Sequence, residues 1–257
     1  MSAYVRRMAL LFVFGTTSCR PTPHRSSMES DKPIQAATHA ATHDATPVAT
    51  HDATHDAAPV PFVAIPKERL CVTAGKVEAP SPGRFHVNQG GMRAVVAGGN
   101  GTSAELAFTY RGPSTATAKL ADGTLRRQIG LKLRALDTCN VVYVMWHVEP
   151  TRGVAVSVKS SPKLHSHEAC GATGYLNVEP TKSLEAPRIA AGDRHTLRAT
   201  LDGLGLRVVA DGTTVWEGVL PREALAFDGP AGIRSDNGEF EFELLNEVRD
   251  KKAVCPH

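Results

Sequence analysis

The sequence predicts an all-β domain that follows a segment without regular structure. From residue 70 to residue 254, short segments show period-two alternation of apolar and polar residues or dense β-branched residues, as half-buried strands do. Glycine-rich turns at residues 98–101, 202–203 and 211–212 separate them and supply the positive φ that hairpins need. No amphipathic run is long enough for a substantial helix, and only residues 221–226 have the length of one turn.

The predicted strands are residues 93–97, 104–110, 128–135, 141–149, 154–159, 196–201, 206–210, 213–218 and 240–245. About ten antiparallel strands cannot remain one flat sheet with a single bare face. We therefore expect two packed layers or a barrel.

The first residues have the pattern of an export signal. Arg6 and Arg7 precede an apolar run at residues 8–15, and small polar residues follow at 16–18. The run is shorter than the roughly 20 residues that span a bilayer, so residues 1–18 are predicted to be a signal peptide that is removed.

Cys19 follows these small residues, and here the sequence resembles the lipobox of bacterial lipoproteins. The resemblance implies that Cys19 is acylated and attaches the chain to a membrane. Thr16 stands where the family usually has Leu, so ordinary cleavage and a periplasmic or secreted protein are the alternative. Arg20, rather than Asp, implies the outer membrane under the usual lipoprotein sorting rule.

Residues 19–66 are predicted to be a lipidated linker, and residues 67–257 the folded domain. The linker is rich in Ala, Thr, His, Pro and Ser and lacks apolar periodicity, so it cannot bury enough surface to offset its chain entropy. Its Thr-His repeat, with histidines at 39, 43, 51 and 55, provides no preorganised metal site.

The chain has five cysteines, so lipidation of Cys19 leaves four in the domain. An even number in an exported domain indicates two disulfides, for which three connectivities exist. We expect Cys71 to pair with Cys255, joining the ends of the domain, and Cys139 to pair with Cys170, closing a local loop of the chain.

Four C-terminal segments carry a second resemblance: residues 195–198 (His-Thr-Leu-Arg), 206–212 (Leu-Arg-Val-Val-Ala-Asp-Gly), 229–237 (Gly-Pro-Ala-Gly-Ile-Arg-Ser-Asp-Asn) and 240–243 (Phe-Glu-Phe-Glu). They resemble the closing strands of concanavalin A-like jelly-roll domains, which include laminin-G-like modules and a 3-keto-disaccharide hydrolase-like domain. The resemblance implies a two-sheet antiparallel jelly-roll sandwich in which residues 229–237 form a turn. It implies the fold more than an activity.

The polar face of one sheet is the candidate binding site. In segment 141–149, alternation separates Val142, Val144, Trp146 and Val148 from Tyr143, Met145, His147 and Glu149. The candidate binding face consists of Arg134, Tyr143, His147, Glu149, Lys159 and Arg198. This face could hold a glycan with acidic groups, although an ordinary solvated sheet face has the same pattern.

Two other constellations are weaker. Glu239, Glu241 and Glu243 share one strand face, as catalytic carboxylates of retaining glucanases do, but we expect solvated glutamates flanking buried phenylalanines. His147, Glu149, His165, His167 and Glu168 could surround a metal only if loop and strand meet. We predict no metal or other cofactor, and the sequence assigns no catalytic residue.

The sequence thus predicts a non-catalytic cell-envelope lipoprotein that binds a saccharide or another envelope component, such as a protein. A glycoside or keto-sugar hydrolase of the same fold and a structural interaction domain are the alternatives. A net charge of +3 on 257 residues does not indicate nucleic-acid binding.

Overall fold

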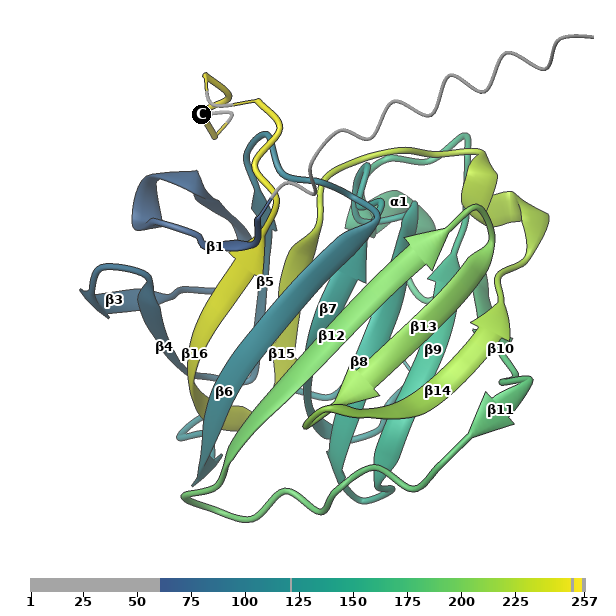
Figure 1. The fold of residues 1–257 in the computed structure, drawn as a ribbon. Coiled ribbons are helices and arrows are strands. Elements are labelled where there is room, and N and C mark those ends of the chain that lie inside the picture. Colours follow the sequence, from purple (N-terminus) through teal and green to yellow (C-terminus); the bar gives the residue numbers. More distant parts are fainter. Residues whose placement is uncertain (1–60, 121, 251, 256–257) are drawn as a thin grey trace, which may run out of the picture. The chain divides into compact units, whose positions relative to one another are not determined.

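The computed structural model describes residues 61–120, 122–250 and 252–255, which form a sandwich of two antiparallel β-sheets (Figure 1). The predicted fold class, an all-β two-sheet antiparallel sandwich, is confirmed. Within this part of the chain, helical structure is limited to α1 (His167–Cys170), η1 (Lys67–Arg69) and η2 (Arg222–Leu225), the last lying in the segment predicted to make one turn.

One sheet has nine strands in the order β11-β14-β13-β12-β6-β16-β4-β3, with β1 paired to β16 outside this path. The strands are β1 (Val63–Ala64), β3 (Glu78–Ser81), β4 (Arg84–Asn88), β6 (Ser103–Pro113), β11 (Lys182–Ser183), β12 (Arg194–Asp202), β13 (Gly205–Ala210), β14 (Thr213–Val219) and β16 (Gly238–Asn246). In Figure 1, β6, β12, β13 and β14 lie in front of the second sheet.

The second sheet has seven strands in the order β10-β9-β8-β7-β15-β5-β2. They are β2 (Leu70–Ala74), β5 (Gly91–Val96), β7 (Arg127–Leu133), β8 (Val141–Glu149), β9 (Gly153–Lys159), β10 (Tyr175–Val178) and β15 (Gly232–Asp236). Strand β15 lies between β5 and β7, so it pairs with segments that are far away in the sequence.

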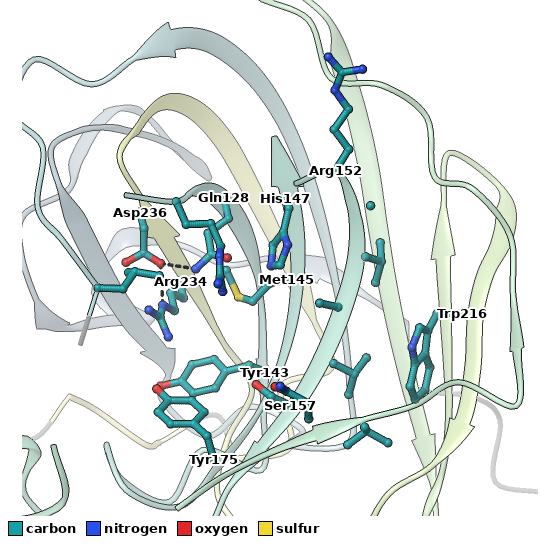
Figure 2. Close-up of a pocket in the computed structure, with 18 of the residues that line it drawn as sticks. Gln128, Tyr143, Met145, His147, Arg152, Ser157, Tyr175, Trp216, Arg234 and Asp236 are labelled. Atoms are coloured by element: carbon teal, nitrogen blue, oxygen red, sulfur yellow. Dashed lines mark hydrogen bonds and ion pairs between the residues drawn. The ribbon is translucent and has the colours of Figure 1, made fainter. Parts of the chain in front are cut away.

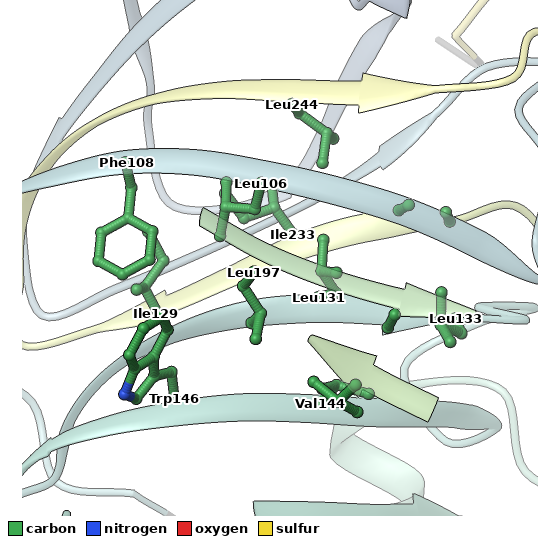
Figure 3. Packing of buried hydrophobic residues seen from close by; sticks show 14 of the residues in the cluster. Leu106, Phe108, Ile129, Leu131, Leu133, Val144, Trp146, Leu197, Ile233 and Leu244 are labelled. Carbon is green, nitrogen blue, oxygen red and sulfur yellow. The ribbon is translucent and has the colours of Figure 1, made fainter. Parts of the chain in front are cut away.

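The core fills the space between the two sheets, as the strand alternation predicts. On β8, Val142, Val144 and Trp146 are fully buried in the main core. Tyr143 and Met145 point to the opposite face, where they join a small separate cluster. Figure 3 shows side chains from both sheets meeting in the main core, where Phe108 of β6 packs edge-on against Trp146 with ring centroids 5.7 Å apart.

All nine predicted strands are present, β8 with the predicted ends and the others with shifted ends, whereas β1, β2, β3, β4, β10, β11 and β15 were not predicted. The important correction is β15. The expectation was a turn over residues 229–237, but Gly232 to Asp236 form a central strand with every residue buried. Two charged side chains within five residues hid its strand character.

Both disulfides join the cysteine pairs expected from the sequence. Cys71 pairs with Cys255 and Cys139 with Cys170, with Cα atoms 5.2 and 5.9 Å apart, within the usual range for a disulfide. The first connects β2 to the C-terminal segment, and the second joins the segment after β7 to α1.

The predicted signal peptide, Cys19 and residues 19–60 of the predicted linker lie outside the described residues. The predicted domain start at residue 67 falls after β1 and after Ile65, which is fully buried. No described helix is both long and apolar enough to cross a membrane.

Candidate functional site: a polar cleft on the seven-stranded sheet

A cleft with a volume of about 1090 Å³ lies over the outer face of the seven-stranded sheet. Its floor comes from β5, β15, β7, β8, β9 and β10, and its rim from residues 118–120, 122–126, 152–153, 167–172 and 179–188. It also reaches Val215 and Trp216 of β14, in the other sheet.

Strand register aligns the floor residues in two rows across the sheet. One row contains Asp236, Gln128 and His147, contributed by β15, β7 and β8. The next row contains Arg93, Arg234, Gly130 and Met145. Because side chains two residues apart on a strand share a face, these rows lie side by side and present a continuous polar surface.

Gly130 stands between Arg234 and Met145 in its row and contributes no side chain. An added Cβ there would collide with the backbone carbonyl of Val144 on β8. Close backbone approach therefore requires glycine at this position.

Asp236 is the centre of the polar network on the floor (Figure 2). Its Oδ2 accepts a hydrogen bond of 2.7 Å from Nε of Arg234 and another of 2.7 Å from Nε2 of Gln128. Its Oδ1 lies 3.5 Å from Nη2 of Arg93. With its side chain only 2% exposed, this carboxylate is held in place by three partners.

Gln128 brings an unused acceptor to the same place. Its Nε2 donates to Asp236, but its buried Oε1 has no hydrogen-bond partner among the described residues. A buried polar atom without a partner costs free energy, and such atoms gather where a ligand or ordered water completes the network.

Two tyrosines form the aromatic part of the cleft, and Figure 2 shows their rings one over the other. The rings of Tyr143 and Tyr175 are stacked with centroids 6.1 Å apart. Tyr143 is buried, whereas Tyr175 is 40% exposed. The Arg234 guanidinium lies 5.0 Å from the centroid of Tyr143, and the Lys159 ammonium 5.1 Å from that of Tyr175. Tyr175 thus presents an apolar ring surface in a cationic setting.

Two buried lysines add to the positive charge of this face. Burial, and then repulsion from Arg93 and Arg234, lowers the pKa of Lys132 from 10.5 to about 8. Within the described part of the chain, its ammonium has no hydrogen-bond or ion-pair partner. Burial, followed by the same two arginines, also lowers the pKa of Lys159, whose ammonium donates to the Gly171 carbonyl at 2.8 Å.

His147 is neutral at physiological pH. Burial, and then repulsion from Arg126 and Arg234, lowers its pKa from 6.5 to about 4. Its Nδ1 lies 3.5 Å from Oγ1 of Thr151, at the limit of a hydrogen bond. A neutral imidazole can both donate and accept, which suits recognition of a hydroxyl group.

The structure brings together part of the predicted binding face. Tyr143 and His147 line the cleft, and Lys159 lies on the same sheet face. Glu149 is exposed at the end of β8 and forms an ion pair with Arg127. Arg134 lies just beyond β7 and donates from Nε to the Phe227 carbonyl at 2.9 Å, outside the cleft lining.

Arg198 corrects the prediction, because it lies on β12 in the other sheet. Its guanidinium lies 4.4 Å from the centroid of the Phe62 ring and 3.8 Å from Glu105. Alternation along a strand assigns a residue to a face, but it does not say which sheet contains that strand.

The glutamates of β16 also lie on the nine-stranded sheet. Glu239 binds Nε2 of His86 at 2.9 Å, and Glu241 receives two hydrogen bonds from Arg111 at 3.1 and 2.8 Å. Glu243 lies 3.4 Å from Arg84. The phenylalanines between them, at 240 and 242, are buried as expected.

The histidines of the proposed metal constellation have separate surroundings. His165 pairs with Asp137 at 2.7 Å, and His167 is on the rim of the cleft. Among the described residues, no group of three or more His, Cys, Asp or Glu side chains is arranged to hold a metal ion.

Sequence reasoning missed Arg93, Gln128, Arg234 and Asp236 as site residues. A signal was present in segment 232–236, where Ile233 and Ser235 alternate with Arg234 and Asp236. Opposite charges two residues apart on a strand share a face and can pair, which is what the structure contains.

No protein-family model and no curated protein matches the chain. Among solved structures, a carbohydrate-binding module (CBM66) from Bacillus subtilis aligns at 12% identity and a TM-score of 0.47, covering 71% of this chain and 96% of that one. Domain 4 of AbnA, an arabinanase from Geobacillus stearothermophilus solved with arabinotriose, aligns at 12% identity and a TM-score of 0.36, covering 76% and 84%. A homodimeric agglutinin from chicken liver aligns at 9% identity and a TM-score of 0.37, covering 60% and 98%. At these identities the likeness concerns the fold and not the function.

Proposed function

We propose that this chain is an exported, lipid-anchored protein of the bacterial cell envelope whose sandwich is a non-catalytic saccharide-binding module. One observation carries the binding function: the cleft floor holds a prebuilt network of buried polar groups beside the exposed ring of Tyr175. Arg234, Asp236 and Gln128 are held in position before any ligand arrives. Saccharide recognition needs such fixed donors and acceptors together with an apolar ring surface.

The carboxylates favour binding over glycoside hydrolysis. Hydrolysis by the usual mechanism needs two carboxyl groups on either side of the scissile bond. Among the described residues, Asp236 is the one carboxylate of the cleft floor, and three partners occupy its oxygens. The other carboxylates of the cleft, Asp122, Glu179 and Glu185, are exposed on the rim.

The anchoring proposal rests on the residue pattern around Cys19 and is supported by the two disulfides, since such bonds persist in oxidising compartments. Substituting Cys19→Ser should move the protein out of the membrane fraction of the producing bacterium. Retention of the variant in that fraction would contradict lipid attachment, and extraction of the wild-type protein by carbonate would do the same.

A glycan array probed with the purified full chain tests the binding function. We expect binding to one class of glycan without release of shortened products, and Tyr175→Ala should weaken that binding about fivefold, because one aromatic contact is worth roughly 1 kcal/mol. Leu225→Ala is the matched control: Leu225 is 52% exposed and lies outside the cleft lining. Silence across neutral and acidic glycans would refute the proposal, and product release would favour the hydrolase.

A further inference from the structure

We infer that the saccharide bound in this cleft carries an anionic group, a carboxylate or a sulfate, which Arg93 and Arg234 receive together. The inference rests on the proposed saccharide-binding function and narrows it to acidic glycans.

The first argument is the position of the two arginines. Arg93 of β5 and Arg234 of β15 are directly opposite each other in the antiparallel register. Like charges at directly opposite positions of a sheet are destabilising. Asp236 offsets this repulsion in part, since it contacts both guanidinium groups. A bound anion would add a second negative charge, with charge-assisted contacts to both arginines.

The second argument is the balance of charge on this face. Four cations point outward from the central strands: Arg93, Lys132, Lys159 and Arg234. Asp236 is the single carboxylate among them, because Glu149 at the end of β8 is already paired with Arg127. Lys159, Lys132 and Arg234 are each less than 9% exposed. Burying this excess of positive charge is costly, and an anionic ligand would offset the cost.

The third argument is the supply of free donors. Arg234 uses Nε for Asp236, and its two terminal nitrogens make no hydrogen bond to any described residue. Arg93 contacts Asp236 through one terminal nitrogen at 3.5 Å and keeps a side-chain exposure of 26%. Both residues line the cleft. A guanidinium binds carboxylate or sulfate oxygens through paired N–H donors. The two side chains together therefore present several charged N–H donors, and a neutral sugar has no anionic oxygens to pair with them.

Matched pairs of oligosaccharides test the inference on the full chain. Titration calorimetry would compare tetragalacturonate with its carboxyl-reduced, neutral counterpart, and a sulfated chondroitin tetrasaccharide with its desulfated form. We expect at least one acidic member to bind tenfold or more tightly than its neutral partner, with affinity falling as salt rises. The two pairs distinguish carboxylate from sulfate.

Arg93→Gln and Arg93→Lys provide the matched variants, since Arg93 is less buried than Arg234 and its removal leaves the Arg234–Asp236 pair intact. Gln should lower the affinity for the acidic member about tenfold more than that for the neutral member, whereas Lys should retain at least half of the preference. Circular dichroism spectra would establish that both variants are folded.

The outcomes separate the two proposals. Neutral and acidic partners bound equally, or an unchanged preference in Arg93→Gln, would overturn the anionic site while leaving saccharide binding in place. If no oligosaccharide binds, a few millimolar sodium sulfate serves as the remaining probe. A rise in melting temperature in the wild type but not in Arg93→Gln would support the anion site, and equal responses would overturn it. The saccharide function is decided separately by the glycan array.

Discussion

Arg234 and Asp236 stand two residues apart on β15, and the guanidinium Nε donates to the carboxylate Oδ2 at 2.7 Å. Their side chains are only 9% and 2% exposed. In this buried position the pair serves both stability and the proposed ligand, because Asp236 fixes the arginine while leaving its terminal nitrogens available.

Replacing Asp236→Asn should lower the free energy of unfolding by about 3–5 kcal/mol, because a buried arginine loses its counterion. Urea denaturation at pH 7 measures this. Glu241→Gln removes one partner of an exposed pair with Arg111 and should cost less than about 1 kcal/mol. Equal losses of unfolding free energy in the two variants would contradict the role of Asp236 as the counterion of buried Arg234.

Lys132 should make stability depend on pH above neutrality. Its pKa is about 8 in the folded protein against 10.5 for an ordinary lysine, so between these values the unfolded chain binds more protons. The contribution of Lys132 therefore makes the free energy of unfolding rise with pH from about 8 to 10.5. Below pH 8 the charged lysine destabilises the fold by roughly 3 kcal/mol, from 1.36 kcal/mol per pKa unit.

Substituting Lys132→Met should raise stability at pH 7 and bring the variant and wild type together near pH 10.5, as measured by urea denaturation across that range. Lys182→Met removes an exposed lysine on β11 and serves as the control. A difference in the free energy of unfolding between Lys132→Met and wild type that is constant at every pH would show that the charge of Lys132 does not destabilise the fold.

His147 should stay neutral far below the usual range of histidine. Its pKa of about 4, against 6.5 for an ordinary histidine, means that the unfolded chain takes up a proton first as pH falls. The contribution of this ring to stability is full above pH 6.5 and is lost as pH falls towards 4. NMR of the imidazole signals should find the His147 ring unchanged between pH 7 and 5, and a midpoint near 6.5 would contradict its buried setting.

The disulfide Cys139–Cys170 should support the cleft as well as the fold. Replacing both cysteines by serine opens a loop of 31 residues and should cost about 4 kcal/mol. It should also weaken glycan binding, since Gly171, which directly follows α1, supplies the carbonyl that holds Lys159 beside Tyr175.

The control is the double serine variant at Cys71 and Cys255, which opens a loop of 184 residues and should cost about 5 kcal/mol with glycan affinity unchanged. Stability would come from urea unfolding and affinity from calorimetry. An equal fall of affinity in both variants would argue against a local role for Cys139–Cys170.

The sequence predicts strands well where alternation is strong, and β8 shows why. Its valines and Trp146 repeat every second residue, so both its ends and its two faces can be assigned without a structure. Strand β15 has one isoleucine and two charged residues, and its strand character comes from pairing with β5 and β7, which no local pattern reveals.

The site was predictable only in part for the same reason. Tyr143 and His147 lie on a strand with clear alternation, whereas Arg93 and Arg234 become neighbours only when β5 pairs with β15. The assignment of Arg198 to this site failed because the sheet to which a strand belongs is set by long-range pairing. The disulfide pairing could be predicted from the sequence because a small even number of cysteines leaves few combinations.

The bond between Cys71 and Cys255 has a mechanical consequence. Cys71 lies on β2, which pairs with β5, which in turn pairs with β15 and its Arg234. If the chain is held at Cys19 as proposed, tension from a ligand in the cleft would cross two strand pairings to reach Cys71. Peeling β2 away from β5 would also pull on residue 255. The disulfide thus distributes the force between the N-terminal and C-terminal ends of the domain. A domain pulled by a bound glycan would therefore resist unfolding from its N-terminal, tethered end.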